Sequence, residues 1–506
     1  MDKKEQQIVA WLMEEGTEEI EDPDSRIDRT DRYDNVIISI QFCVHCGKTM
    51  EYPDGIEDTY ESIERHYAGK SVFITGGTGF LGKVFVEKLL YSCPKINKIF
   101  LLLRNKNKSD ISERIKQLLE LPIFDRIRKE KPENLEKVVP LSGDVALPNL
   151  GMKQEDEQML IDQVSYIFHF AANVKFNETL NVAMNINVEG TRRVLKLCQR
   201  MKNIKVFVYV STAYSNTHKR VLEEIVYSSP ASIDEVYKIL EQEVTNEDKL
   251  KKLICGRPNT YTFAKALAES LVSQERGDFA TIIIRPSIVS ASFREPLTGW
   301  LDNWFGATAL LATIAKGLNR IILSKSTNLL DLIPVDFVSN LIVAAAAKCK
   351  RSNEVTVYNS CTSDANPLTM AQFGRLITED SVKHNFHEII CPTLFFTQSQ
   401  WLLKFLTIIM QIIPCFIADC WLRLMGRPPR FMKMQRRILQ TRSALQYFSS
   451  NSWQMKCQRT RDLFASLSDS DRLKFPFDPT LFKWDEYLPI YCMGIRKFLF
   501  KLSSRN

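Results

Sequence analysis

The chain has 506 residues, which is too long for one ordinary hydrophobic core and predicts two or three folding units. Hydrophobic residues make up 45% of it and charged residues 25%, a balance that excludes a globally disordered protein. The net charge of +7 is small for this length, and the lysines and arginines are spread along the chain. We therefore expect an anionic ligand or a membrane surface as partner, and no nucleic acid.

Residues 1–66 are acidic and polar without a steady apolar period, which predicts a loosely ordered extension. The first residues resemble neither a secretory signal nor an Arg-rich transit peptide. Cys43 and Cys46 have the spacing of a metal-binding pair, but a zinc site needs about four ligands and no second pair follows, so we expect no metal. The twelve cysteines lack the dense spacing of a disulfide framework, which predicts free thiols in a reducing compartment.

Residues 67–365 alternate short β-branched runs with amphipathic stretches. The runs are SVFIT, KIFLLL, KVVPL, SYIFHF, KVFVYVS, TIIIRP and EVTVYN. Such alternation is typical of βαβ units around a parallel sheet. The sequence therefore predicts an α/β fold with a Rossmann-type doubly wound sheet over this range.

Residues 375–506 predict a smaller, mainly helical carboxyl-terminal domain, and residues 401–424 are its most apolar stretch. Lys404, Pro414 and Asp419 interrupt that stretch, so we favour a buried or interfacial helical hairpin over a transmembrane helix. Nearby cations would suit either a polyanionic substrate handle or anionic lipid headgroups, and we favour membrane contact. These cations are Arg427, Arg430, Lys433, Arg436 and Arg437.

A glycine-rich segment, TGGTGFLG, follows the first predicted strand and precedes a predicted helix. Gly76 would permit the turn, Gly79 would let the backbone approach a pyrophosphate, and Gly82 would let the helix pack closely on the sheet. Three glycines can also serve packing alone. Their position between a strand and a helix favours nucleotide binding.

The second predicted strand ends in Arg104, followed by Lys106 and Lys108, where an NAD-preferring protein usually carries Asp or Glu. Cations there suit a 2′-phosphate, which favours NADPH over a merely solvated basic loop. Asp144, after the third strand, would accept hydrogen bonds from the adenine amino group. Small residues after the fourth strand would lie along the cofactor, namely Ala171, Ala172 and Asn173.

Tyr261 and Lys265 are four residues apart on a predicted helix, which brings both side chains to one face. A nearby ammonium would lower the pKa of the tyrosine from its ordinary value near 10, as proton exchange at neutral pH requires. The fifth strand ends in Ser211 and Thr212 at the carboxyl edge of the sheet. We prefer Thr212 as the hydroxyl that steadies a substrate oxygen, with Ser211 as the alternative.

TGGTGFLG, SGDV, HFAAN, NVEGT, VSTAY, YxxxK and RPSIV occur in the order seen in extended short-chain dehydrogenases. More narrowly, the chain resembles fatty acyl-CoA reductases of the insect type over about residues 66–500, through EPLTGWLDNWFG, LRLMGRPP, YFSSNSW and WDEYLPIYCMGIRKFLFK. The resemblance implies reduction of long-chain acyl-CoA to a primary alcohol through an aldehyde, with two NADPH consumed. It makes Thr212, Tyr261 and Lys265 the catalytic set.

The resemblance also implies a set of residues that line the cofactor. They are Gly76, Thr78, Gly79, Phe80, Leu81, Gly82, Arg104, Asp144, Val145, Ala171, Ala172, Asn173, Asn187, Ser211, Tyr261, Lys265, Arg285, Pro286, Ser287 and Ile288. It further implies the endoplasmic reticulum surface or peroxisomes, with the active domain facing the cytosol, and it is compatible with a homodimer.

Two other functions compete with this interpretation. A hydroxysteroid dehydrogenase or sugar epimerase would share the glycine-rich loop and the YxxxK pair, but neither explains the carboxyl-terminal region. A catalytically silent NADPH-binding membrane scaffold would explain the fold, but the intact Thr212, Tyr261 and Lys265 argue against it.

Overall fold

The computed structural model describes residues 60–104, 111–241, 253–254 and 256–502. Ser62–Asn506 form one compact unit. Cys43, Cys46, Lys106 and Lys108, for which the sequence raised hypotheses, lie outside the described residues.

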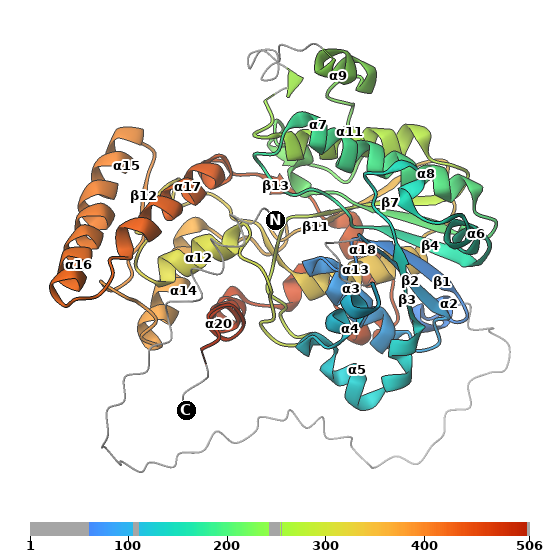
Figure 1. Cartoon of the computed structure of the whole chain (residues 1–506), viewed down its shortest axis with the longest axis horizontal. Coiled ribbons are helices and arrows are strands. Elements are labelled where there is room, and N and C mark those ends of the chain that lie inside the picture. The colour runs from blue at the N-terminus through green and yellow to red at the C-terminus, as the bar shows by residue number, and fades with distance from the viewer. Residues whose placement is uncertain (1–59, 105–110, 242–252, 255, 503–506) are drawn as a thin grey trace. The chain divides into compact units, whose positions relative to one another are not determined.

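A seven-stranded parallel sheet forms the centre of the Ser62–Asn506 unit (Figure 1). Its strand order is β11-β7-β5-β4-β1-β2-β3, so the chain starts in the middle and winds outward to both edges. The seven strands coincide with the seven apolar runs, which confirms the predicted Rossmann-type fold. They are β1 (Ser71–Thr75), β2 (Lys98–Leu103), β3 (Val138–Ser142), β4 (Val164–His169), β5 (Val206–Val210), β7 (Ala280–Pro286) and β11 (Thr356–Ser360).

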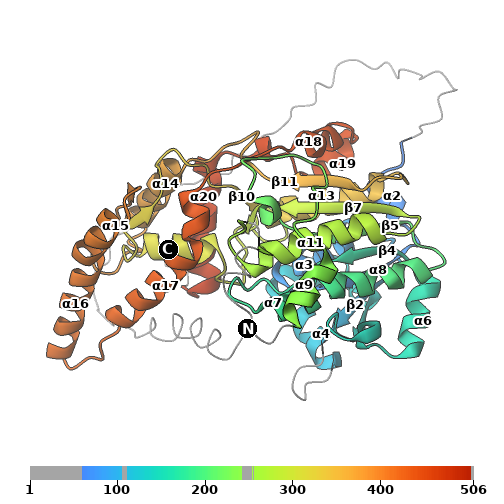
Figure 2. The same ribbon diagram turned by 90° about the horizontal axis from the view of Figure 1, so that it is seen from above.

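Helices cover both faces of the sheet. Successive strand residues point to opposite sides, and because the strands are largely apolar on both sides, both faces must be buried. In β1, for example, Val72 and Ile74 belong to one hydrophobic cluster and Phe73 to the other. Helices α3 (Phe80–Ser92) and α13 (Val335–Lys348) cover the first face (Figure 1). Helices α8 (Gly190–Arg200) and α11 (Thr260–Glu275) cover the second (Figure 2).

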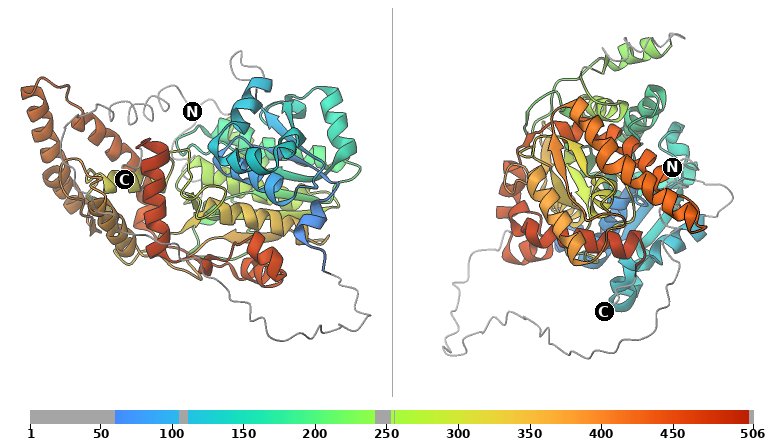
Figure 3. Two further views of the ribbon diagram at one scale, coloured as in Figure 1. Left: turned by 90° about the horizontal axis from the view of Figure 1, so that it is seen from below. Right: turned by 90° about the vertical axis from the view of Figure 1, so that its left-hand side faces the viewer.

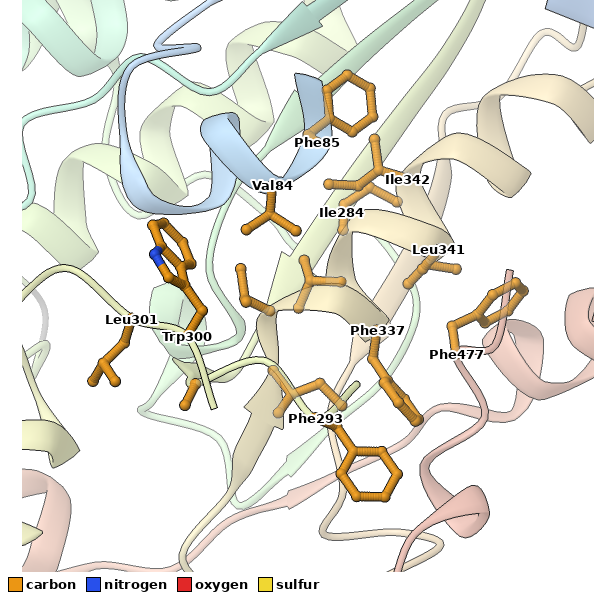
Figure 4. Packing of buried hydrophobic residues seen from close by; sticks show 14 of the residues in the cluster. Val84, Phe85, Ile284, Phe293, Trp300, Leu301, Phe337, Leu341, Ile342 and Phe477 are labelled. Carbon is orange, nitrogen blue, oxygen red and sulfur yellow. The ribbon is translucent and has the colours of Figure 1, made fainter. Parts of the chain in front are cut away.

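The first of these clusters reaches into the carboxyl-terminal part of the chain. Figure 4 shows Val84 of α3 and Ile342 of α13 close to Ile284 of β7, with Phe477 packed at the same core. The cluster continues to Leu499. The predicted boundary between residues 67–365 and 375–506 therefore separates two stretches of sequence and not two hydrophobic cores.

The fold begins slightly earlier than the sequence predicted. Residues 63–66, assigned to the loose extension, belong to helix α2 (Ile63–Tyr67). Ile63 and Tyr67 are four residues apart and fully buried, and the Tyr67 hydroxyl donates to the Val343 carbonyl. One apolar pair in a polar segment is too short a pattern to reveal a helix.

The carboxyl-terminal region is mainly helical, as predicted, and it pairs with the sheet domain. Two of its short strands, β12 (Phe395–Thr397) and β13 (Gln454–Met455), pair in parallel with β9 (Ile321–Leu323) and β6 (Val221–Leu222). Its helices, seen from two further sides in Figure 3, are α14 (Met370–Lys383), α15 (Gln400–Thr407), α16 (Ile413–Leu424), α17 (Phe431–Ser450), α18 (Gln458–Ala465), α19 (Asp469–Lys474) and α20 (Trp484–Gly494).

Shorter elements connect the strands. They are helices α4 (Ile111–Leu119), α5 (Asp125–Glu130), α6 (Gln154–Gln163), α7 (Leu180–Ala183), α9 (Ile233–Leu240) and α12 (Ala307–Ala315), and strands β8 (Ile288–Ser290) and β10 (Leu332–Pro334).

The hairpin predicted within residues 401–424 is wrong. Helices α15 and α16 are joined by a π-helical turn (Ile408–Ile412) into one continuous helix, Gln400–Leu424. Pro414 stands directly after the π turn, at the start of α16, where its lack of an N–H is tolerated. The reversal comes instead after Leu424. There the Asp419 carboxylate accepts hydrogen bonds from the N–H groups that begin α17, at 2.8–2.9 Å.

Candidate active site

The glycine-rich loop joins β1 to α3, and close backbone packing explains two of its glycines. Gly76 has φ +74°, and a Cβ there would lie 2.6 Å from the Ala171 nitrogen. A Cβ on Gly82 would lie 2.4 Å from the Gly76 carbonyl oxygen. Neither position can hold a side chain. The predicted turn is present at Gly76, whereas the close contacts at Gly82 are with the loop and not with the sheet.

Gly79 differs because the space beside it is open. A Cβ there would meet only the Gly76 carbonyl oxygen, at 3.2 Å, and no side chain caps the helix that begins here. The first N–H groups of α3, those of Phe80, Leu81 and Gly82, therefore lack an intrahelical partner and form the positive end of the helix dipole. With Thr78 beside them, these groups fit a pyrophosphate.

The ends of β2 and β3 carry the residues predicted to contact the adenosine end of a cofactor. Arg104 follows β2 directly and is exposed, as a residue that meets a 2′-phosphate must be. Asp144 follows β3, and its Oδ1 accepts a hydrogen bond from the Ala146 N–H at 2.9 Å. That bond fixes the carboxylate at the strand end, beside the buried Val145.

Asn187, which was predicted to line the cofactor, has a structural role in this fold. It is buried in a π-helical turn (Met184–Glu189), and its amide makes two hydrogen bonds to the main chain of Asn173, at 2.7 and 3.0 Å. Asn187 thus holds the loop after β4, where Ala171, Ala172 and Asn173 are half-buried. It positions the predicted cofactor-lining loop rather than projecting a free group.

The structure brings Thr212 and Tyr261 together. Asn259 caps α11 by accepting the Thr262 N–H at 2.9 Å, so Tyr261 and Lys265 lie one turn apart at the start of that helix. The Thr212 hydroxyl, at the end of β5, accepts the Tyr214 N–H at 3.3 Å and lies near enough to the half-buried Tyr261 phenol to lower the pKa of that phenol. Two hydroxyls therefore lie together at the carboxyl edge of the sheet, two strands away from the glycine-rich loop.

The protonation of Tyr261 and Lys265 differs from the prediction. Burial raises the pKa of Tyr261 to about 12, and the nearby Thr212 hydroxyl offsets only part of that rise. Burial lowers the pKa of Lys265 to about 7, against the opposing charge of Glu269. The Lys265 Nζ donates to the Val210 carbonyl at 2.7 Å and lies 4.6 Å from the Tyr209 ring centroid. At neutral pH Tyr261 is therefore a protonated hydrogen-bond donor, and not a phenol activated by the lysine.

Two further hydroxyls at this edge have no partner among the described residues. Ser211 follows β5 and Ser287 follows β7, and each Oγ is buried and unsatisfied. Buried polar atoms are normally hydrogen-bonded, so these two are available to a ligand. Pro286 ends β7 and Ile288 begins β8, which places the predicted turn beside them.

Arg285 is the clearest departure from the predicted cofactor set. Its guanidinium is 2% exposed and bound to both carboxylate oxygens of Glu269, at 2.9 and 2.7 Å. It also donates to the carbonyls of Glu223 and Ile225. The Arg285 side chain is therefore occupied by buried partners within the protein, which leaves only its backbone for a cofactor.

Sequence reasoning missed Glu269, which stands one helical turn after Lys265. Its carboxylate also accepts from the Ser215 hydroxyl at 3.1 Å. It missed the aromatic side chains at Tyr261 as well: the Phe176 ring centroid is 6.0 Å from that of Tyr261, and that of Phe448 is 5.4 Å from Phe176. The spacing of Glu269 from Lys265 was a usable signal, whereas nothing local links Phe176 to Phe448.

Comparison with known families gives two matches along the chain. The NAD-binding model described as male sterility protein matches residues 74–342, and the Sterile model, with the same description, matches residues 410–502. Fatty acyl-CoA reductase 1 of Xenopus laevis and that of Homo sapiens are each 38% identical over 443 residues, 87% of this chain and 86% of theirs. Fatty acyl-CoA reductase 2 of Mus musculus is 35% identical over 444 residues, with the same coverage.

Solved structures resemble the fold. The terminal reductase domain of the myxalamid biosynthetic pathway has a TM-score of 0.59 at 19% identity, covering 85% of this chain and 90% of that one. The reductase domain of a nonribosomal peptide synthetase from Mycobacterium tuberculosis has a TM-score of 0.55 at 16% identity, covering 86% and 92%. At such identities the likeness is one of fold.

Proposed function

The chain belongs to the fatty acyl-CoA reductase family, and from that premise we propose its reaction: long-chain fatty acyl-CoA is reduced to the primary alcohol with NADPH. The observation that carries this proposal is the pair of hydroxyls, Thr212 and Tyr261, at the same sheet edge as a dinucleotide loop. A sugar epimerase or hydroxysteroid dehydrogenase is not supported by the relatives, whose likeness covers both parts of the chain.

The reaction proceeds in two reductions at the same hydroxyls. The nicotinamide cofactor supplies hydride when it is bound. In the first reduction, Thr212 and Tyr261 donate hydrogen bonds to the oxyanion that forms from the thioester carbonyl. When that oxyanion collapses to the aldehyde, CoA leaves as thiolate and takes up a proton. In the second, Tyr261 gives its proton to the alkoxide, and Lys265 and water replace it.

Protonation of the two side chains suits these roles. Because burial raises the pKa of Tyr261 to about 12, the phenol keeps its proton until an alkoxide of higher basicity forms. Because burial lowers the pKa of Lys265 to about 7, the ammonium can release a proton near neutral pH. The buried Ser211 and Ser287 hydroxyls lie where they can hold the cofactor or substrate.

We attribute the choice of NADPH to Arg104. It is exposed at the end of β2, and no acidic residue occupies the strand end where an NAD-binding protein holds the ribose hydroxyls. A guanidinium at this place can bind a 2′-phosphate through two parallel hydrogen bonds.

The enzyme is proposed to act on a membrane surface through the Gln400–Leu424 helix. This is a helix long and apolar enough to cross a membrane, yet little of it is buried in the fold. Trp401 is 71% exposed and Trp421 is 60% exposed. Other large apolar side chains are exposed between them, namely Phe405, Ile408, Ile409, Ile413, Phe416 and Ile417.

The other face of the same helix is attached to the protein, which favours lying on the membrane over spanning it. Residues at every fourth position are buried there: Leu403, Thr407, Gln411, Cys415 and Asp419. The stripe is partly polar, since the side-chain amide of Gln411 bonds that of Gln435 at 2.7 Å. A helix fixed along one side can bury its free side in the headgroup region. Arg423, Arg427 and Arg436, all exposed nearby, suit anionic headgroups.

We place this contact on the endoplasmic reticulum or peroxisomes, with the sheet domain facing the cytosol. The cysteines support a location on the reducing, cytosolic side of the membrane. All nine described cysteines are free thiols, and six of them are buried.

The reaction is tested by its stoichiometry. Purified protein is incubated with vesicles, hexadecanoyl-CoA and NADPH, and the alcohol, CoA and oxidised cofactor are quantified together. We expect two NADPH oxidised and one CoA released for each alcohol. Binding of NADPH without alcohol from any chain length would support the silent scaffold instead.

A further inference from the structure

Rings from three distant segments form a continuous aromatic cluster beside the catalytic hydroxyls. Phe176 lies in the loop after β4, Tyr214 follows Thr212, and Phe448 and Trp453 stand at and beyond the end of α17. Phe448 contacts Phe176 at 5.4 Å, Tyr214 at 5.3 Å and Trp453 at 6.4 Å between ring centroids. Phe448 is therefore the centre of the cluster.

Two rings of the aromatic cluster are buried, and the other two are partly exposed. Trp453 and Tyr214 are buried, and the Trp453 indole donates to the Thr217 carbonyl at 3.1 Å. Phe176 and Phe448 are only half-buried. The buried rings thus pack against Phe448, while Phe448 and Phe176 each keep part of their surface exposed.

Geometry relates these two rings to the reacting carbon. If the substrate's carbonyl oxygen accepts hydrogen bonds from Thr212 and Tyr261, its carbonyl carbon and the first carbons of the acyl chain must lie beside the residues that surround these two hydroxyls. Phe176 is 6.0 Å from the Tyr261 ring, and it offers no hydrogen-bonding atom. An alkyl chain suits such a wall, because apolar contact there removes both surfaces from water.

Helix α17 connects this wall to the helix that we place on the membrane. It spans 20 residues, from Phe431 beside α16 to Ser450 beside the cluster. At 1.5 Å per residue this is a path of about 30 Å. Figures 1 and 2 show α17 between the α15–α16 helix and the sheet domain.

We propose that Phe176 and Phe448 form the wall of the acyl-chain subsite next to the thioester carbon, with Phe448 setting how much bulk is accepted there. The inference rests on the proposed function, because it takes the acyl chain as the ligand. A methyl branch near the carboxyl end collides with this wall in the wild-type protein and is tolerated when the ring is removed.

The test is a competition between hexadecanoyl-CoA and 3-methylhexadecanoyl-CoA with full-length protein on phosphatidylcholine vesicles. Phe448→Ala should raise kcat/KM for the branched substrate, relative to the straight one, by about tenfold or more, as one misfitting methyl group warrants. Phe176→Ala should shift the ratio in the same direction. KM for NADPH should not change in either variant.

Matched variants separate this role from a general loss of stability. Phe448→Leu keeps an apolar side chain and should shift the ratio less than Phe448→Ala while folding normally. Phe498→Ala removes an equally half-buried ring that packs on a different hydrophobic cluster from Phe448, and it should leave the ratio unchanged.

An unchanged ratio in folded Phe448→Ala and Phe448→Leu, both still making alcohol, would overturn the subsite. A wild-type protein that makes no alcohol from either substrate would instead overturn the proposed function, and the subsite with it. The two failures are therefore distinguishable.

Discussion

The reacting centre and the α15–α16 helix meet opposite physical demands. At the sheet edge, Tyr261 is half-buried and Lys265 is buried, and burial shifts the pKa values of both. On the Gln400–Leu424 helix, apolar side chains such as Trp401 and Trp421 are left in water. The first arrangement suits chemistry on a carbonyl, and the second is stable only against an apolar phase. The contrast teaches that burial and exposure mark two different surfaces, the one proposed for catalysis and the one proposed for membrane contact.

Apart from changes at Tyr261 itself, the largest effect should come from the oxyanion contact. Thr212→Val keeps the shape of the side chain and removes its hydroxyl, so kcat should fall about 10²- to 10³-fold. KM for NADPH should change little, because Thr212 is assigned to the substrate oxygen. Steady-state kinetics on vesicles would measure both, and an unaltered kcat would assign the oxyanion to Ser211 instead.

The second effect concerns the membrane helix. Ile417→Asp together with Trp421→Asp places two charges on its exposed apolar face, so the vesicle-bound fraction should fall by at least about tenfold. Turnover of a short, water-soluble acyl-CoA should persist, since the catalytic hydroxyls are untouched. Leu473→Asp is the matched control, because Leu473 is 84% exposed on α19, outside this surface. Undiminished flotation of the double variant with vesicles would contradict the proposed surface.

The third effect sharpens the description of the cofactor site. Arg104→Glu should lower kcat/KM with NADPH about tenfold and favour NADH, because a carboxylate repels the 2′-phosphate and accepts hydrogen bonds from ribose hydroxyls. If wild type and variant discriminate equally between NADPH and NADH, another residue must bind the 2′-phosphate.

The smallest effect is a pH dependence. The pKa of Lys265 is lowered to about 7, so the fraction of ammonium falls tenfold for each pH unit well above that value. If the ammonium resupplies the proton, kcat/KM should decline above about pH 7. Lys265→Arg should lower kcat/KM and remove that decline, since a guanidinium keeps its proton throughout this pH range and cannot resupply it. A decline that persists in the variant would assign the pH dependence to another group.

Local sequence patterns were sufficient for the fold and for part of the site. Seven apolar runs marked the seven strands, and the glycine spacing marked a turn whose close contacts at Gly76 and Gly82 the structure shows. Both are local consequences of backbone geometry, which a short window of residues can specify.

Side-chain partners were harder to predict because they come from elsewhere in the chain. Arg285 was assigned to the cofactor because nothing near it revealed that Glu269 binds both ends of its guanidinium. Phe176 and Phe448 meet only after the carboxyl-terminal region folds onto the sheet domain. Asp419 was interpreted as interrupting a helix, whereas it caps the next one.

The central claim is that Tyr261 donates the proton that completes alcohol formation. The most direct test compares wild type with Tyr261→Phe, using NADPH and acyl-CoAs of graded length, with product analysis and a separate NADPH-binding measurement. We predict alcohol from the wild type and, in a folded variant that still binds NADPH, a loss of about 10²- to 10⁴-fold. Equal alcohol formation by both proteins would contradict the claim.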